Sequence, residues 1–586
     1  MHKNASRRDF AGNLRLRIVA VAAVVGLLST LAAWLLLRLI HFFTNLFFYQ
    51  TWSDAERSPA LNTLGLWVIL VPVIGGLLIG LIARYGSEKI RGHGIPEAIE
   101  AILFGKSKMS PKVAILKPLT SGIAIGSGGP FGAEGPIIMT GGALGSLVAQ
   151  YLHLTGAERK TLLVAGAVAG MTAIFGTPVA AVLLAVELLL FELRPRSLLP
   201  VAVACAVAGF ARALWQDAGP LFPLQTLAPG VPMLAGCLLA GLASGALSWL
   251  LSTSLYRVED CFGKLPLHWM WWPALGGLAV GIGGFLEPRA LGVGYDVIGD
   301  LLHNHLAAGV MLGLLLCKAV MWVIALGSGT SGGVLAPLLM MGAGLGALLA
   351  PWMPGADPAL WPLVFMAATL GGMMRAPIMS VVFALELTHD VNAMLPLLAA
   401  SSVAYGFTVL TMRRSILTEK IARRGYHIYR EYGIDPLERH AVGELMTRTV
   451  ESIAADAAIA DVLASRFGHG QVHRAFPVLR DGAVVGMLDR AALLARAPHA
   501  VTVSDLFGAN PIILALADET ARSVASRLAV HGLERLPVVA DAQSRLLVGI
   551  ISRSDLIKPS LEVFDEEERR ELFRHLPFRR RAVADK

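Results

Sequence analysis

Long apolar segments follow one another along the chain from about Ile18 to Met412. The segment from Leu66 to Ile82 is uninterrupted, and the one from Val310 to Leu326 contains a single charged residue, Lys318. Segments of this length and composition are typical of membrane-spanning helices. The stretch from Leu116 to Val148 is instead broken by Gly and Pro, and broken helices are tolerated at membrane depth only inside protein or beside a water-filled cavity. We therefore expect a binding site at such broken segments.

An internal repeat organises these segments. GSGGPFGAEGPIIMTGGALGSLVA begins at Gly126, and GSGTSGGVLAPLLMMGAGLGALLA begins 201 residues later, at Gly327. A second pair of blocks, TPVAAVLLAVEL and APIMSVVFALEL, ends near Glu187 and Glu386, which are 199 residues apart. Because these two glutamates recur in both repeats, we expect them to have structural roles at helix contacts.

A third and weaker pair sets Gly92 and Gly94 against Gly292 and Gly294. Three blocks in the same order at almost one offset indicate two structural repeats. Repeats with Gly- and Pro-interrupted segments at matching places are typical of transporters whose site lies between the halves. The relative direction of the two repeats cannot be read from the sequence.

After Met412 a basic segment leads into a region of soluble character with its own repeat, in which Pro477 matches Pro537 and Gly486 matches Gly549. Each unit is predicted to form a short strand, a helix, two apolar strands around a turn and a final helix. The expected domains are a cytoplasmic N-terminal segment (1–17), a membrane domain (18–430, with repeats at roughly 60–210 and 265–412), two small α/β modules (436–497 and 503–560) and a charged tail (561–586).

Composition supports the membrane assignment. Of 586 residues, 55% are hydrophobic and only 16% are charged, with a mean hydropathy of +0.62. Ordinary soluble proteins carry roughly a quarter charged residues, so a single water-soluble domain, a disordered chain and a disulfide scaffold are excluded. The four cysteines show no CxxC or Cys/His spacing, and we expect no metal site.

The net charge of +8 is concentrated at the N-terminus and beyond position 410. Under the positive-inside rule such residues mark cytoplasmic segments, and we expect no nucleic-acid partner. The apolar run from Ile18 to Leu39 lacks a small-residue cleavage pattern and is predicted to be a first membrane helix rather than a signal peptide. We expect an integral protein of a bacterial inner membrane, surrounded by lipid, with its N-terminus and C-terminal modules in the cytoplasm.

Three motifs carry a resemblance. GHGIPE (Gly92 to Glu97), GAEGP (Gly132 to Pro136) and GVLAP (Gly333 to Pro337) resemble the anion-pathway signatures of the CLC chloride channel and transporter family, over essentially residues 15–430. The modules that follow resemble a tandem CBS domain pair. The resemblance implies a polytopic α-helical membrane protein with two inverted repeats of broken, tilted helices and a cytoplasmic CBS pair. It also implies a homodimer with one pathway for chloride and protons in each subunit.

Such loops have a physical logic of their own. Glycine lets backbone N–H groups approach a ligand, and Pro fits the first helical turn, so a loop that opens a helix directs unpaired N–H groups and a positive dipole end at an anion. The alternative is that these glycines only allow close helix packing. The candidate anion-binding residues, most of them in these loops, are Gly92, His93, Gly94, Ile95, Pro96, Gly132, Ala133, Gly135, Pro136, Gly333, Val334, Leu335, Ala336 and Leu417.

Two carboxylates are candidates for proton transfer. Glu134 lies among Gly and Pro at membrane depth, where a charge is costly and therefore points to function. By resemblance it is the external gating glutamate, the alternative being a structural acid bound by the same N–H groups. Glu192 aligns by resemblance with the internal proton-transfer glutamate of the exchangers. Its alternative is a surface acid paired with Arg194.

Three positions depart from the family pattern. His93 stands where members usually have Ser, Leu335 where they have Phe, and Leu417 where a Tyr hydroxyl contacts the central anion. His93 either donates one hydrogen bond to the anion or points away and leaves only backbone donors. A weaker central site implies looser coupling. The loop lacks the Asn of the fluoride-exporting branch, so chloride is the expected anion, with nitrate or bromide as alternatives.

In the second module, Ser552 and Asp555 resemble the pair that holds a ribose in CBS domains, whereas the first module has Asp489 and Ala492 at these positions. We expect at most one adenine-nucleotide site, and a purely structural pair is the alternative. No cofactor is expected in the membrane domain.

The leading function is chloride/proton antiport with Glu134 as external gate and Glu192 as internal proton acceptor. A passive or loosely coupled chloride channel on the same scaffold, regulated by the CBS pair, is the alternative. A membrane-anchored nucleotide sensor is disfavoured, because an anchor needs no intramembrane carboxylate. An enzyme is not expected, because no nucleophile–base pair, metal cluster or phosphate-binding loop is recognisable.

Overall fold

The computed structural model describes residues 16–216, 219–355, 357–425, 437, 440–468, 473–491, 493, 501–507 and 512–559. Most of the predicted N-terminal segment, Ala492 and the charged tail lie outside this range. The chain divides into two compact units, Met1–Glu431 and Tyr432–Lys586, which are described separately.

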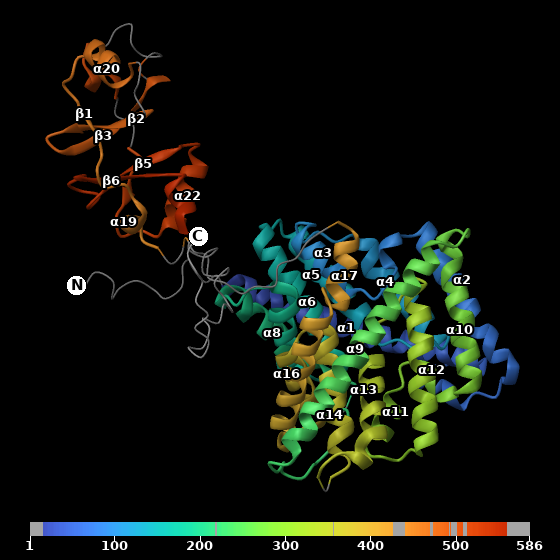
Figure 1. Cartoon of the computed structure of the whole chain (residues 1–586). Coiled ribbons are helices and arrows are strands. Elements are labelled where there is room, and N and C mark those ends of the chain that lie inside the picture. The colour runs from blue at the N-terminus through green and yellow to red at the C-terminus, as the bar shows by residue number, and fades with distance from the viewer. Residues whose placement is uncertain are drawn as a thin grey trace, which may run out of the picture. The chain divides into compact units, whose positions relative to one another are not determined.

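The first unit is helical throughout its described part (Figure 1). Among the residues described, seven of its helical segments are long and apolar enough to cross a membrane, as the apolar runs predict. Its α-helices are α1 (Leu16–Tyr49), α2 (Leu70–Tyr85), α3 (Ile95–Leu103), α4 (Pro111–Gly126), α5 (Glu134–Tyr151), α6 (Gly156–Phe175), α7 (Pro178–Leu184), α8 (Pro195–Arg212), α9 (Met233–Gly263), α10 (Trp272–Leu286), α11 (Tyr295–Leu302), α12 (Ala308–Gly327), α13 (Leu335–Leu349), α14 (Leu360–Met374), α15 (Pro377–Thr388), α16 (Met394–Thr411) and α17 (Ile416–Arg423).

The first helix is longer than its sequence pattern predicts. α1 continues ten residues beyond Leu39 to Tyr49. Its last turns contain Asn45, whose amide donates to the carbonyls of Ser53 and Ala55 and so holds the loop that follows. At 34 residues α1 is about 50 Å long. Because this exceeds the roughly 30 Å of a hydrocarbon core, α1 crosses at a tilt or extends into the interface.

The predicted repeat is visible in the order of the helices. α4 ends at Gly126 and α12 at Gly327, and α5 begins at Glu134 and α13 at Leu335. α1 packs against α4, α6 and α8, and α9 packs against their counterparts α12, α14 and α16. α1 and α9 are therefore equivalent and extend the repeats beyond 60–210 and 265–412.

A pair of equivalent glycines shows how the halves are related. The N–H of Gly333 donates to the carbonyl of Gly132 at 2.8 Å, and the N–H of Gly132 donates back at 3.3 Å, in antiparallel register. Equivalent residues that exchange both hydrogen bonds in this way are related to each other by a local two-fold axis that passes between them. The two repeats therefore point in opposite directions, which confirms the inverted arrangement.

Close backbone contacts explain part of the high glycine content. A Cβ on Gly76 of α2 would lie 2.3 Å from the carbonyl oxygen of Pro273, and a Cβ on Gly277 of α10 would lie 2.2 Å from that of Pro72. Gly76 and Gly277 are equivalent in the two repeats. They let α2 and α10 cross in direct backbone contact, which a side chain would prevent.

The described part of the second unit contains two three-stranded sheets of the same topology. In the first, β1 (Ile453–Ala454) is parallel to β2 (Ala475–Arg480), which is antiparallel to β3 (Ala483–Asp489). In the second, β4 (Ala515–Leu516), β5 (Arg535–Val539) and β6 (Leu547–Ser552) repeat this order. α20 (Ile459–Arg466) and α22 (Ala521–Val530) supply the intervening helices, and α19 (Val442–Leu445) precedes β1. The predicted strand, helix and strand pair are present in both modules, each with its own apolar core.

Candidate functional site

The three motif loops meet at one glycine. A Cβ on Gly135 would lie 2.0 Å from the carbonyl oxygen of His93 and 3.1 Å from the Cα of Gly333. Gly135 follows Glu134 in the first turn of α5, His93 lies in the loop before α3, and Gly333 lies two residues before α13. Three helix N-termini, with their unpaired N–H groups, are therefore brought together as the spacing of the motifs predicts.

The Glu134 side chain binds the N-terminus of α13. Its Oε1 accepts hydrogen bonds from the N–H groups of Leu335 at 2.5 Å and Ala336 at 3.3 Å. Its Oε2 is buried and has no hydrogen-bond partner among the described residues. The side chain is fully buried. The carboxylate thus occupies the kind of backbone site that an inorganic anion would use.

His93 is buried beside this site. It is 1% exposed, and within the described residues neither ring nitrogen has a hydrogen-bond partner. The following Gly94 has φ +92° and caps α3, and its N–H donates to the Glu97 carboxylate at 3.0 Å. The imidazole is therefore held in the loop by burial alone, which leaves a donor free for a ligand.

Two buried lysines fix the loops that precede α3 and α11. Lys117 donates to the carbonyls of Ile90 and Gly92, and the equivalent Lys318 donates to those of Ala290 and Gly292. Both lysines are fully buried. Sequence reasoning noted Lys318 alone and did not pair it with Lys117, although the pair keeps the 201-residue offset. Each ammonium group substitutes for the hydrogen bonds that these irregular loops lack.

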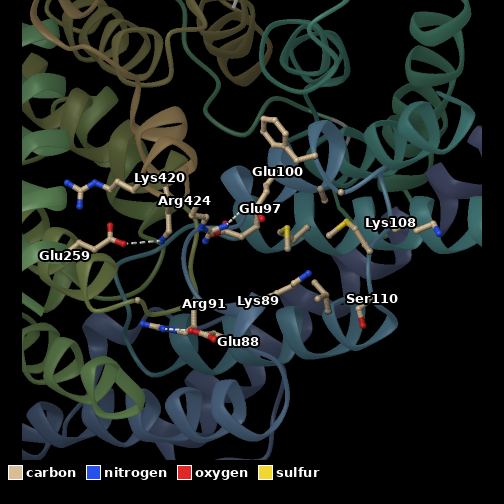
Figure 2. A pocket seen from close by; sticks show the side chains of 18 of the residues that line it. Glu88, Lys89, Arg91, Glu97, Glu100, Lys108, Ser110, Glu259, Lys420 and Arg424 are labelled. Atoms are coloured by element: carbon tan, nitrogen blue, oxygen red, sulfur yellow. Dashed lines mark hydrogen bonds and ion pairs between the residues drawn. The ribbon is translucent and has the colours of Figure 1, made fainter. Parts of the chain in front are cut away.

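A charged cavity of about 520 Å³ lies against the loop before α3 (Figure 2). Figure 2 shows Arg424 directed at Glu97 and Lys420 directed at Glu259. Arg424 pairs with Glu97 at 2.8 Å and with Glu100 at 2.5 Å, whereas Lys420 pairs with Glu259 at 3.9 Å. The charged lining residues are Glu88, Lys89, Arg91, Glu97, Glu100, Lys108, Glu259, Lys420, Arg423 and Arg424. Six cations and four acids give the cavity a positive balance.

Arg91 is held at the cavity wall by aromatic rings. Its guanidinium lies 4.5 Å from the ring centroid of Trp269 and 5.7 Å from that of Trp272, and it pairs with Glu88 at 3.2 Å. Met139 of α5 also lines the cavity, and its Cγ lies 3.0 Å from the Cβ position of Gly94. The cavity therefore reaches the first of the three converging loops.

Leu417 is buried in α17, which packs against α3. The residue before it, Ile416, accepts a hydrogen bond from the hydroxyl of Tyr256 on α9 through its carbonyl. A buried tyrosine is thus present next to α17. It belongs to another helix, and its hydroxyl donates to a backbone carbonyl. Sequence reasoning missed Tyr256, because nothing in its local pattern distinguishes it from a core residue.

Glu192 lies apart from these loops, behind a π-helical turn, Ala185–Leu190. Its carboxylate lies 3.7 Å from both Lys160 and Arg194 and accepts a hydrogen bond from Ser197 at 2.9 Å. The side chain is 26% exposed. The pairing with Arg194 on which the alternative interpretation depends is therefore present.

In the second module Ser552 and Asp555 already bind each other. The Ser552 hydroxyl donates to Asp555 at 2.6 Å, and Lys558 donates to the other carboxylate oxygen at 2.6 Å. Asp489 ends β3, and Ala492 lies outside the described residues. A ribose at this place would have to replace the Ser552 contact.

Known proteins are similar to this chain in sequence or in fold. The family model described as voltage gated chloride channel matches residues 74–409, and the CBS domain model matches residues 442–499 and 503–562. A ClcB-like chloride channel protein of Ralstonia nicotianae is 30% identical over 425 residues, covering 69% of this chain and 97% of that protein. The H(+)/Cl(-) exchange transporter ClcA of Citrobacter koseri is 27% identical over 409 residues, covering 65% and 83%. The crystal structure of a slow cyanobacterial Cl-/H+ antiporter, 21% identical, superposes with a TM-score of 0.61 over 70% of this chain and 99% of that one.

Proposed function

Because the chain belongs to the voltage-gated chloride channel (CLC) family, whose members transport anions and are not enzymes, we propose that it exchanges chloride for protons across a membrane. Glu134 acts as the external gate and Glu192 as the internal proton acceptor. The protein is a homodimer of a bacterial inner membrane, with one pathway in each subunit. The named relatives include both a chloride channel protein and an exchange transporter, so the coupling to protons is the part that needs a test.

One observation carries the proposal: the Glu134 carboxylate accepts hydrogen bonds from Leu335 and Ala336 at the start of α13. When ionised, it competes with chloride for these N–H groups. When protonated, it loses the charge that the helix N-terminus favours, and chloride displaces it. Proton uptake by Glu134 and anion passage are then alternating uses of one site.

The charged cavity is the cytoplasmic vestibule in this proposal. It is lined in part by α17, and three of its six cations, Lys420, Arg423 and Arg424, belong to the basic segment after Met412 that the positive-inside rule assigns to the cytoplasm. Its positive balance raises the local concentration of anions beside the loop that contains His93. His93 then donates to the anion, in the place where family members usually have a serine hydroxyl.

Loose coupling is supported by one departure from the family pattern. Leu417 offers no hydroxyl to a central anion. Slippage toward channel-like chloride flux is therefore the second candidate mode.

Reconstituted flux with chloride and proton electrodes tests the proposal. We expect an outward chloride gradient to drive uphill proton uptake into liposomes containing the intact protein. Glu134→Ala should retain chloride flux, lose its pH dependence and abolish proton movement, and Glu192→Ala should reduce proton movement with chloride flux preserved. Chloride flux without proton movement in the intact protein would favour the channel. Stoichiometric proton movement in Glu134→Ala would contradict the gate assignment.

The CBS pair is proposed to bind one adenine nucleotide through Ser552 and Asp555. Calorimetric titration of the intact protein with ATP, ADP and AMP should show binding of one nucleotide per chain, which Asp555→Ala abolishes. Titrations without heat for all three nucleotides would leave the pair a structural role only.

A further inference from the structure

A tyrosine from the second repeat shares the Glu134 site. Tyr295 begins α11, and its hydroxyl is buried with no hydrogen-bond partner among the described residues. The same is true of Glu134 Oε2. α11 packs against α13, whose first residue, Leu335, binds the Glu134 carboxylate, and this places Tyr295 within electrostatic range of Glu134. Two buried polar oxygens without partners, close enough to sense each other, are costly unless a partner is reached in another state.

The tyrosine ring is fixed in place. Its centroid lies 6.0 Å from that of Phe175 in an edge contact and 6.4 Å from that of Phe222. Gly294, which precedes it, has φ +79°, and a Cβ there would lie 2.1 Å from the Cε of Met340 on α13. The start of α11 is thus packed against the second turn of α13, whose first turn binds Glu134.

The loop before Tyr295 is tied to the segment that carries Glu134. The N–H of Gly292 donates to the carbonyl of Gly128, six residues before Glu134, at 3.0 Å. The Gly292 carbonyl is in turn held by Lys318 at 2.8 Å. The position of the Tyr295 hydroxyl relative to Glu134 is therefore set by backbone contacts between the repeats.

The two-fold relation of the repeats gives an independent reason to associate Tyr295 with Glu134. Glu134 is equivalent to Leu335, and Tyr295 is equivalent to Ile95, one residue after the matching Gly94 and Gly294. The pair of Tyr295 and Glu134 thus corresponds to an apolar pair, Ile95 and Leu335, in the other half. Both members of the pair are polar only on the side where the gate lies.

We propose that Tyr295 is a positioning residue for the gate: its hydroxyl binds the protonated Glu134 carboxyl group after that group has left the N-terminus of α13. In the state described here Oε1 binds α13, and the phenol has no hydrogen-bond partner within the described part of the chain. Rotation of the neutral carboxyl group off α13 brings the two together, so that the phenol and the carboxyl group exchange one hydrogen bond. This bond stabilises the displaced, protonated gate, and it rests on the proposed function of Glu134.

Other ionisable groups near this pair are few. α13 and α14, against which α11 packs, carry none in their described helices. His93 lies across Gly135, Lys318 lies 3.8 Å from the Cβ position of Gly294, and Asp296 follows Tyr295. A hydroxyl deletion at Tyr295 leaves all three unchanged.

Chloride efflux from proteoliposomes as a function of external pH tests the inference. Tyr295→Phe keeps the ring contacts and removes only the hydroxyl, so folding should be preserved. Loss of one net hydrogen bond to the protonated gate should move half-maximal flux to a pH lower by roughly 0.4 to 1 unit. Tyr49→Phe is the matched control, because the Tyr49 hydroxyl donates to the Ser58 carbonyl elsewhere in the unit, and should leave the profile unchanged.

The same substitution in the Glu134→Ala background makes the test specific. We expect Tyr295→Phe to have no effect there, because the group it positions is gone. An unchanged pH profile for Tyr295→Phe alone would overturn the inference, as would an equal change in both backgrounds. If the parent protein and Glu134→Ala share one pH profile, the proposed gate itself fails, and this outcome is distinguishable from the other two.

Discussion

At the scale of residues, the proposed anion site is built mainly of backbone N–H groups. Leu335 and Ala336 provide donors that carry no formal charge, so they bind an anion without holding it as a lysine would. The buried cations near the site, Lys117 and Lys318, are occupied by backbone carbonyls. They shape the loops, and their charge is shared with groups that do not move.

His93 is the side chain whose removal should weaken anion binding. In His93→Ala only backbone donors remain, and losing one hydrogen bond to a charged ligand should reduce chloride affinity roughly 10-fold or more. Isothermal titration with chloride measures the change, with His93→Ser as the control that restores a donor. Equal affinities for the parent and both variants would show that the imidazole points away from the anion.

The sequence predicted the site at this scale only in part. The motifs correctly predicted that the three loops meet, because glycine spacing reports directly on close backbone approach. Tyr256, Tyr295 and the pairing of Lys117 with Lys318 were not predicted. Their roles depend on which distant carbonyl or carboxylate lies opposite, and local pattern carries no information about that.

At the scale of elements, Gly135 is the contact that lets α3, α5 and α13 converge. Gly135→Ala places a methyl group 2.0 Å from the His93 carbonyl oxygen. This distance is too short, and it can lengthen only if α5 and the loop before α3 move apart. We expect most chloride flux to be lost and the melting temperature in detergent to fall.

The matched control is Gly406→Ala in α16, where a Cβ meets no atom within 4 Å. The same chemical change should there leave flux unaltered and stabilise the helix by up to ~1 kcal/mol. Equal flux in the two variants would mean that the loops tolerate separation and that their close approach is not needed for transport.

Glu187 and Glu386 each cap a helix N-terminus in the other repeat. Glu386 accepts from the N–H groups of Val179 and Ala180 at the start of α7, and Glu187 accepts from that of Met379 at the start of α15. This agrees with the structural role expected from their recurrence. Each pairs a carboxylate with a helix N-terminus across the interface between the halves.

Neutralising either cap should lower stability without changing coupling. We expect Glu386→Gln and Glu187→Gln each to lower the free energy of unfolding by about 1–2 kcal/mol. Thermal melts in detergent of both single variants and the double variant measure the stability that each glutamate contributes. A loss of proton coupling with an unchanged melting temperature would assign the glutamates to transport instead.

The elements themselves were predicted well where both signals agreed. Apolar length and Gly/Pro interruption together predicted the break between α4 and α5 and its counterpart before α13. The equivalence of α1 and α9 was not predicted. Both helices have several residues exposed to the surroundings. Such positions need only be apolar, so the two helices share no sequence motif that would show that they are equivalent.

At the scale of the whole molecule, the chain joins a helical membrane unit to a unit that contains small sheets. For this second unit the structure predicts how stability depends on the pH of the solution. In it, burial raises the pKa of Asp555, but hydrogen bonds from Lys558 and Ser552 outweigh burial and hold that pKa below its usual value. The folded pKa is thus lower than the unfolded one. The ionised carboxylate stabilises the module above pH ~4, and this contribution is lost as the pH falls through the folded pKa.

We therefore expect the second module to open more readily as the pH falls below about 4. Hydrogen exchange of peptides from β5 and β6, corrected for intrinsic rates, should show this loss of protection. Asp555→Asn should be less protected at pH 6 and should show a flatter pH response. An identical response in both proteins would mean that another group governs the acid sensitivity.

The pairing of Gly132 with Gly333 has a consequence for the origin of sidedness. A pore built on a two-fold axis from identical halves would look the same from either side of the membrane, and would have no inward or outward direction. Here the carboxylate of Glu134 is bound by the backbone of Leu335, its own counterpart in the other half. This departure from symmetry, an acid opposite an alkyl chain, makes the two sides of the proposed path chemically different.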